Sequence, residues 1–286
     1  MSRAFFVSDL HGRVDRYEKL FAAVERDPPA AVFLGGDLLP SGFLLAGTAA
    51  PDEDFVTGFL AARFARLRSA LGAAYPRVFL ILGNDDPRRE EEDLKAAEAD
   101  GIWAYAHARR FALGPYTVLG YACIPPTPFL LKDWERYDVS RHVEPGAVSP
   151  EEGWRSLPAD PHDMKYGTIQ RDLAELAGAD DLSQTICLFH APPYQTALDR
   201  AALDGKMVDH VPLDVHIGSI AVRRFIESRQ PLVTMHGHVH ESARLTGAWM
   251  ARLGRTICLS AAHDGPELAL VDFDLRTPAA AARRLL

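Results

Sequence analysis

The chain has 286 residues, of which 48% are hydrophobic and 24% charged, and its formal net charge is −8. This composition is typical of a globular protein with a sizeable core and excludes long disordered regions. The acidic balance makes a nucleic-acid polymer an unexpected partner, because such binding depends on clustered Lys and Arg.

Apolar runs and helical patterns alternate along the chain. In chain order they predict a strand at 4–9, a helix at 13–27, a strand at 31–37, a helix at 54–71, a strand at 78–85, a helix at 168–178, a strand at 185–190, a helix at 219–230 and a strand at 232–238. The strands are apolar almost throughout, as in sheets that helices cover on both faces, whereas the helices space their apolar residues at three and four. We therefore expect an α/β fold.

The C-terminal part of the sequence has a different pattern. Strands are predicted at 256–260 and 268–274, and no helix separates them. Consecutive strands of this kind predict an antiparallel second sheet, so that the sheets are mixed overall. For residues 277–286 we expect a frayed tail.

We interpret residues 1–286 as a single domain that contains one unusual segment. This segment, at about 123–165, is rich in proline and shows no sustained periodicity. An irregular stretch of this length inside a domain is usually functional, so we expect a lid or insertion there.

Side chains that can bind metal ions close the predicted strands. Within two pairs, Asp9 with His11 and His238 with His240, the spacing directs both side chains to one side of an extended backbone. Carboxylate, amide and imidazole groups suit manganese, iron or zinc, and so large a set exceeds what one ion takes from a protein. Two ions that share a carboxylate would use all of the candidates, which are Asp9, His11, Asp37, Asn84, His190, His238 and His240.

Five short motifs carry a resemblance to a known family. They are DLH at 9–11, GGD at 35–37, GND at 83–85, the histidine of LFHAPPY at 190, and GHVH at 237–240. In this order they resemble the motifs of the calcineurin-like metallophosphoesterases, over nearly the whole chain, and other stretches look like a bacterial and archaeal branch of predicted phosphoesterases. The resemblance implies a four-layer α/β/β/α sandwich of two mixed sheets flanked by helices.

The resemblance also implies a role for each candidate ligand. Asp37 would bridge two divalent metal ions, for which manganese is the first choice and iron or zinc the alternatives. One metal site would be completed by Asp9, His11 and His240, and the other by Asn84, His190 and His238. The implied reaction is hydrolysis of a phosphodiester or phosphomonoester in a small phosphorylated substrate, by attack of a hydroxide that bridges the metals. Asp37, Asn84 and His190 are therefore catalytic candidates as well as ligands.

One motif departs from the family pattern. Many relatives carry a histidine after Gly-Asn, thought to protonate the leaving oxygen, where this chain has Asp85. A carboxylate beside two cations stays ionised and is a poor acid. The enzyme would then act on esters with good leaving groups or borrow an acid from His216 or His236. We expect His236 to hold a metal ligand by a hydrogen bond rather than to bind metal itself.

Three residues of the irregular segment are candidate substrate contacts. Trp134 and Tyr137 most simply pack the segment against the sandwich, and stacking on a nucleobase is the alternative. Arg136 is a candidate for steering an anionic substrate.

Cysteine usage and the N-terminus bear on the cellular location. Three cysteines, an odd number without metal-type spacing, predict neither a disulfide framework nor a cysteine-ligated zinc site. The first apolar run reaches Asp9 too soon for a signal peptide, and no apolar stretch has the length of a membrane span. We expect a cytoplasmic protein without a membrane partner.

Two other functions stay open at this point. A non-catalytic interaction scaffold is an alternative, because some proteins of this fold have lost ligands, although here every ligand position is filled. A nuclease is less expected, given the net charge of −8. The sequence also allows a homo-oligomer.

Overall fold

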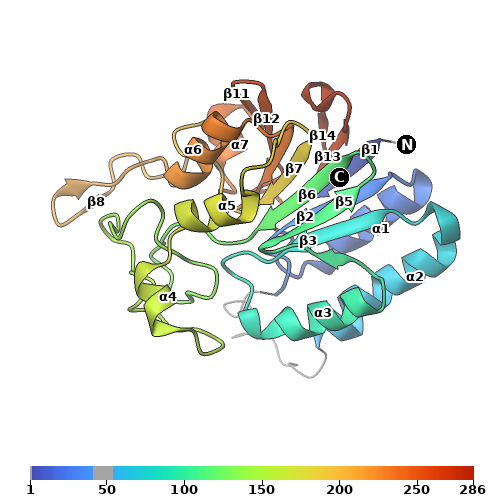
Figure 1. Cartoon of the computed structure of the whole chain (residues 1–286), viewed down its shortest axis with the longest axis horizontal. Helices are drawn as coiled ribbons and strands as arrows, with labels where there is room; N and C mark the ends of the chain where they lie inside the picture. Colours follow the sequence, from blue (N-terminus) through green and yellow to red (C-terminus); the bar gives the residue numbers. More distant parts are fainter. Residues whose placement is uncertain (1, 41–53) are drawn as a thin grey trace.

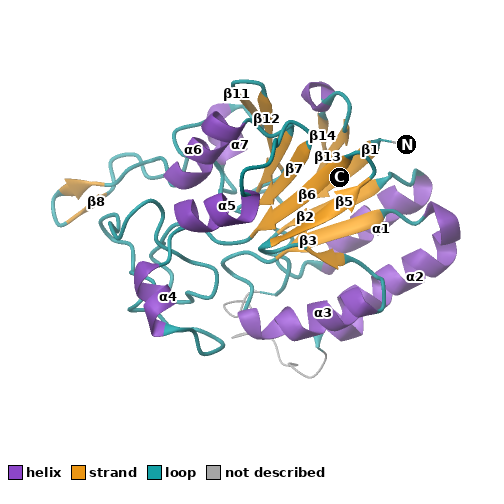
Figure 2. Cartoon of the chain, viewed as in Figure 1, coloured by secondary structure: helices purple, strands orange, loops and turns teal. Residues whose placement is uncertain are grey.

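The computed structural model describes residues 2–40 and 54–286. Two six-stranded sheets form the centre of the molecule (Figures 1 and 2). In sheet order, the first consists of β14 (Ala282–Leu285), β13 (Ala269–Asp274), β1 (Arg3–Val7), β2 (Ala31–Gly35), β3 (Arg77–Ile81) and β4 (Ala104–Tyr105). The second consists of β11 (Met250–Leu253), β12 (Thr256–Ser260), β10 (Val233–His236), β7 (Thr185–Phe189), β6 (Tyr116–Tyr121) and β5 (Arg109–Leu113).

Helices cover the outer faces of both sheets. On one side lie α1 (Val14–Arg26), the π-helix η2 (Phe55–Ala61) with α2 (Ala62–Leu71), and α3 (Glu91–Ala99); on the other lie α5 (Ile169–Ala177), α6 (Ile220–Arg229) and α7 (Ser242–Thr246) (Figure 1). Between them the sheets face each other, with β2 and β3 of the first sheet contacting β6 and β7 of the second. The arrangement confirms the expected four-layer α/β/β/α sandwich of two mixed sheets.

Shorter elements lie in the connections between these strands and helices. They are α4 (Pro161–Tyr166), the hairpin of β8 (Met207–Val208) and β9 (Val211–Pro212), and the 3₁₀ turns η3 (Gly72–Ala74), η4 (Arg88–Glu90) and η5 (Pro278–Ala280). Across the described ranges, no helix combines the length and the apolar character that a membrane span requires.

Buried apolar strands explain why the sheets form. Every residue of β2 and of β7 is buried, and the Phe33 and Phe79 rings stack with centroids 5.4 Å apart. Such strands need cover on both faces, which the helices on one side and the facing sheet on the other provide.

Strand direction decides where polar residues gather. In the first sheet β1, β2 and β3 are parallel, and in the second β6, β7, β10 and β12 are parallel. Parallel strands bring their carboxyl ends to one edge, where ligands of α/β proteins usually bind. The loops that leave β1, β2, β3, β7 and β10 carry the candidate metal ligands.

Two predictions for the C-terminal part are wrong. The strands at 256–260 and 268–274 do not pair with each other, because β12 joins β10 in the second sheet whereas β13 joins β1 in the first. Residues 277–286 are not a frayed tail, since β14 pairs with β13 along the edge of the first sheet. Tertiary pairing decides both outcomes, and an apolar run does not reveal its partner.

The proline-rich segment is irregular but ordered by buried contacts. Isolated β-bridges join Ile124 to Glu135 and Leu131 to Trp154. Lys132 and Glu135 form a fully buried ion pair at 2.5 Å, and Thr127 donates to the Glu135 carboxylate through both its backbone N–H and its hydroxyl. These contacts join distant parts of the segment to one another and give it a defined conformation.

Candidate metal centre

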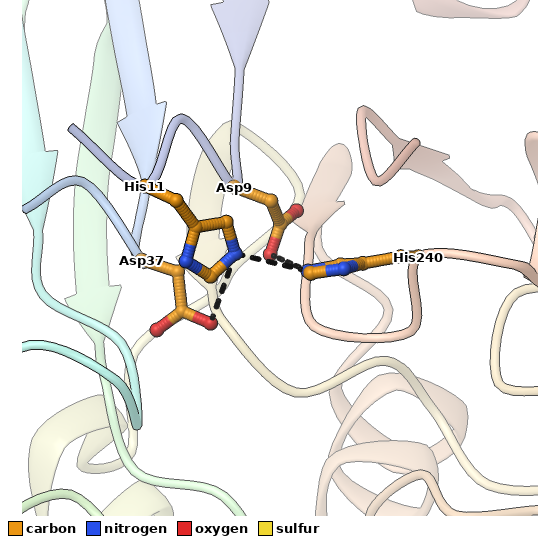
Figure 3. Close-up of side chains that lie close together, drawn as sticks. All are labelled: Asp9, His11, Asp37 and His240. Carbon is orange, nitrogen blue, oxygen red and sulfur yellow. Dashed lines mark hydrogen bonds and ion pairs between the residues drawn. The ribbon is translucent and has the colours of Figure 1, made fainter. Parts of the chain in front are cut away.

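Four of the predicted ligands form a compact cluster at the carboxyl ends of the strands (Figure 3). One ligand atom from each of Asp9, His11, Asp37 and His240 lies within 4.8 Å of all the others. His240 Nε2 lies 3.3 Å from Asp9 Oδ1 and 3.2 Å from His11 Nε2, and His11 Nε2 lies 3.9 Å from Asp37 Oδ2. The first predicted ligand group is therefore assembled around one point.

The second predicted group adjoins the first through Asp37. His190 Nε2 lies 3.3 Å from Asp37 Oδ2 and 3.1 Å from Asn84 Oδ1. The other ring nitrogen of His190 bonds the Gly35 carbonyl oxygen at 2.8 Å, which fixes the ring so that Nε2 faces the other two side chains. The His238 ring lies 5.4 Å from that of His190, between centroids. The Asp37 carboxylate thus lies against both groups.

The backbone of the centre adopts an unusual conformation. Asp9, His11, Asp37 and His238 have φ angles of 58°, 48°, 51° and 73°. These values lie in the left-handed region and cost roughly 1–3 kcal/mol each for non-glycine residues, so such strain is usually found where function requires it. Gly83 has a related role, because a Cβ there would collide with Asp37 and lie 2.7 Å from His190 Nε2.

The donor set fits divalent metal ions. Asp9 Oδ2 is buried and accepts no hydrogen bond from the part of the chain that the structure describes. An unsatisfied buried carboxylate oxygen is unfavourable unless a cation compensates it. The two imidazole nitrogens of His11 and His240, 3.2 Å apart, likewise need a proton or a cation between them. The residues present could therefore hold the metal pair.

Charges within the metal-free cluster shift the pKa values in opposite directions. Burial raises the pKa of Asp37, but the charge and hydrogen bond of His190 outweigh burial and hold this pKa below the usual range. The hydrogen bond and charge of His240 likewise outweigh burial at Asp9 and lower the pKa of that carboxyl group. Burial lowers the pKa of His238 to about 3. The carboxylates are thus ionised and His238 is neutral, as ligands must be.

Binding of manganese should release protons. Burial lowers the pKa values of His190 and His240, but Asp37 and Asp9 respectively raise them more, to about 10 and about 9. Both rings are therefore protonated at pH 7, and a metal ion must displace these protons. We expect the affinity for manganese to rise between about pH 6 and 9, with roughly two protons released at neutral pH. Calorimetry in buffers of different ionisation enthalpy measures this number, and binding without proton release would contradict the assignment.

Asp85, the residue after Asn84, lies beside the cluster. Its backbone N–H donates to Asp37 Oδ1 at 2.8 Å, and its carboxylate lies 3.6 Å from His11 Nδ1. In the metal-free protein, burial and the charge of Asp37 raise the pKa of Asp85 to about 6. Two bound cations would instead lower the pKa of Asp85.

Asp86 has a role that was not predicted from the sequence. Its buried carboxylate accepts hydrogen bonds from the backbone N–H groups of Leu38, Leu39 and Gly83, at 3.0, 2.8 and 2.9 Å. It therefore ties the loop that carries Asp37 to the loop that carries Asn84. The only signal in the sequence was a second aspartate after Gly-Asn.

The two candidate acids differ in their contacts. His216 Nδ1 lies 2.8 Å from Asp199 Oδ1. His236 is buried, and its ring nitrogens bond the Ala191 carbonyl oxygen and Thr234 Oγ1, each at 2.8 Å. The expectation that His236 holds a metal ligand by a hydrogen bond is therefore wrong, because both of its nitrogens are occupied elsewhere.

The three candidate substrate contacts pack within the protein. Trp134 is buried and donates from Nε1 to the Asp86 carbonyl oxygen at 2.8 Å, and Tyr137 is buried with its hydroxyl on Glu151 at 2.7 Å. Base stacking by these rings is not supported, because both side chains are buried, and packing accounts for both. Arg136 makes two 2.6 Å bonds to Asp163, so its cation is already paired.

The fold and the cluster together define a metal-binding α/β sandwich. The family model of calcineurin-like phosphoesterases matches residues 2–242, so the chain belongs to this family. Its members are hydrolases that act on phosphoric ester bonds, and this chain is accordingly a phosphoesterase.

Solved structures with a similar fold agree with this membership. The protein TT1561 of Thermus thermophilus is 18% identical, with a TM-score of 0.54, over 99% of this chain and 98% of that chain. Another crystal structure is 17% identical, with a TM-score of 0.60, over 100% of this chain and 98% of that chain. At such identities the similarity concerns the fold alone. None of the curated proteins compared with the sequence matches it.

Proposed function

We propose that the chain is a dinuclear metal-dependent phosphohydrolase that cleaves a phosphodiester or phosphomonoester in a small substrate. The observation that carries this proposal is the position of Asp37, whose carboxylate lies 3.3 Å from His190 Nε2 and 3.9 Å from His11 Nε2. A carboxylate between two ligand groups is the arrangement that two ions need. Manganese is the metal we propose, with iron or zinc as alternatives.

The seven predicted ligands would bind the two ions as two groups that share Asp37. Asp9, His11 and His240 would hold one ion, Asn84, His190 and His238 the other, and Asp37 both. When bound, the metal pair lowers the pKa of a water molecule and compensates charge on the phosphate. The fixed ring of His190 and the clamped loops around Asp37 keep the ligands in position without reorganisation.

His216 is our candidate for the proton donor. Asp199 is fully buried and accepts hydrogen bonds from three backbone N–H groups. It also lies against His216 Nδ1, and this contact favours a proton on Nδ1. The other ring nitrogen, Nε2, is then the atom that would exchange a proton with the substrate. The same segment contacts the metal loop, because the Ala202 N–H donates to Glu241, the residue after His240. These contacts support His216 over Asp85 as an acid.

Hydrolysis of aryl phosphate esters by metal-stripped protein tests the proposal. We expect turnover of bis-p-nitrophenyl phosphate or p-nitrophenyl phosphate only after manganese is added. A plot of log rate against leaving-group pKa should be shallow if His216 donates a proton and should steepen in His216→Gln. Two bound ions without turnover of any ester would favour an interaction scaffold instead.

A further inference from the structure

A cavity lies away from the metal cluster. It has a volume of about 630 Å³ and is enclosed by β5 and β6, helices α4 and α5, and the irregular segment 123–165. Its lining residues include none of the seven predicted metal ligands in the described part of the chain. A volume of this size suits a small metabolite.

Every carboxylate that lines the cavity already has a partner. Glu135 pairs with Lys132, Asp163 and Asp172 pair with Arg136, and Glu175 pairs with Arg171. Asp133 accepts from the Arg88 backbone N–H and from the backbone and hydroxyl of Ser156. Each of these acidic side chains therefore has an ion-pair or hydrogen-bond partner within the protein.

Arg155 is a cation on the cavity wall without an anionic partner. Its guanidinium donates to the carbonyl oxygens of Lys132 and Pro150 and to Met164 Sδ, and no described carboxylate lies within ion-pair distance. Burial lowers the pKa of Arg155, and the charge of Asp133 opposes this shift. Three of the five donors of the guanidinium are used, which leaves two for a ligand.

Arg88 provides a second incompletely paired guanidinium. It lies over the Trp134 ring, 5.3 Å from the centroid, and within residues 2–40 and 54–286 its guanidinium donates from Nε alone, to Glu91 at 3.3 Å. Glu91 is shared with Lys95 at 3.5 Å. Arg155 and Arg88 thus line the same cavity, and both have unused donors.

We propose that this cavity binds a small phosphate-bearing molecule between Arg155 and Arg88. Planar guanidinium groups bind phosphate oxygens through paired hydrogen bonds, and a phosphate would give Arg155 the anionic partner that it lacks among the described residues. The cavity wall also includes Trp134 and Asp133, which contact the loop of Asn84 through the Asp86 carbonyl oxygen and the Arg88 backbone N–H. The site is independent of the proposed metal chemistry.

Calorimetric titration of metal-free protein with inorganic phosphate tests the proposal. We expect saturable binding that Arg155→Met weakens at least about tenfold, because it removes a charge-assisted pair. Arg141→Met is the matched control, since Arg141 lies in the same segment but outside the cavity, paired with Glu151. His240→Asn removes a cation from the metal centre. The affinity of both control variants for inorganic phosphate should stay within about twofold of that of the parent protein.

Two results would overturn the proposal. One is the absence of saturable phosphate binding up to about 10 mM. The other is binding that depends on His240 and not on Arg155, which would place the phosphate at the metal centre. Near-ultraviolet circular dichroism checks the fold, and Arg88→Met, with the same expected loss, takes the place of Arg155→Met if that variant does not fold.

Discussion

Replacing Asp37 with asparagine should lower kcat/KM for an aryl phosphate ester by roughly 10³-fold, because two cations lose their shared anionic ligand. Asparagine keeps the size of the side chain but presents one neutral oxygen where the carboxylate now faces both His190 and His11. Steady-state kinetics at saturating manganese measures the effect and separates it from simple loss of affinity.

Asp27→Asn is a suitable control for this variant. Asp27 is an exposed carboxylate beside Arg3 and takes no part in the metal cluster. Asp27→Asn makes the same chemical change as Asp37→Asn, but outside the metal cluster. The activity of Asp27→Asn should therefore match that of the parent protein. Retention of more than about a tenth of the activity by Asp37→Asn, in manganese-loaded protein, would contradict the bridging role.

Replacing Asp86 with alanine should lower the free energy of unfolding by about 3 kcal/mol. Three buried backbone N–H groups lose their acceptor, each worth roughly 1–3 kcal/mol. The net loss is smaller than the sum, because burial and the charge of Asp37 raise the pKa of Asp86 to about 8 and its removal relieves that cost. Urea denaturation of the metal-free protein measures the change.

The neighbouring residue provides the control for Asp86. The Asp85 side chain is 35% exposed and accepts one hydrogen bond, from Asn84. Asp85→Ala should therefore change the free energy of unfolding by less than about 1 kcal/mol. Equal effects of the two substitutions would mean that Asp86 does not clamp the two loops.

Local patterns in the sequence were enough to predict most of the elements that position the site. The apolar runs at 31–37 and 185–190 correspond to β2 and β7, and the polar residues that follow them, Asp37 and His190, lie 3.3 Å apart. Each run located a strand and the polar residue at its end, and the two residues meet because β2 and β7 face each other from the two sheets.

Long-range features were beyond the same patterns. β12 and β13 belong to different sheets because β12 pairs with β10 and β13 pairs with β1. The sequence of an apolar run does not indicate which strand it will pair with. The clamp by Asp86 joins residues about 48 positions apart and has no periodic signature. Likewise, nothing in the letters distinguishes His236, which bonds Ala191 and Thr234, from its neighbour His238.

The central claim is that one carboxylate, that of Asp37, joins two metal ions. Anomalous diffraction from crystals soaked in manganese tests it most directly, because each ion produces its own peak. We predict two peaks per chain, one among Asp9, His11 and His240 and one among Asn84, His190 and His238, with Asp37 between them. A single peak, or two peaks away from Asp37, would contradict the dinuclear centre.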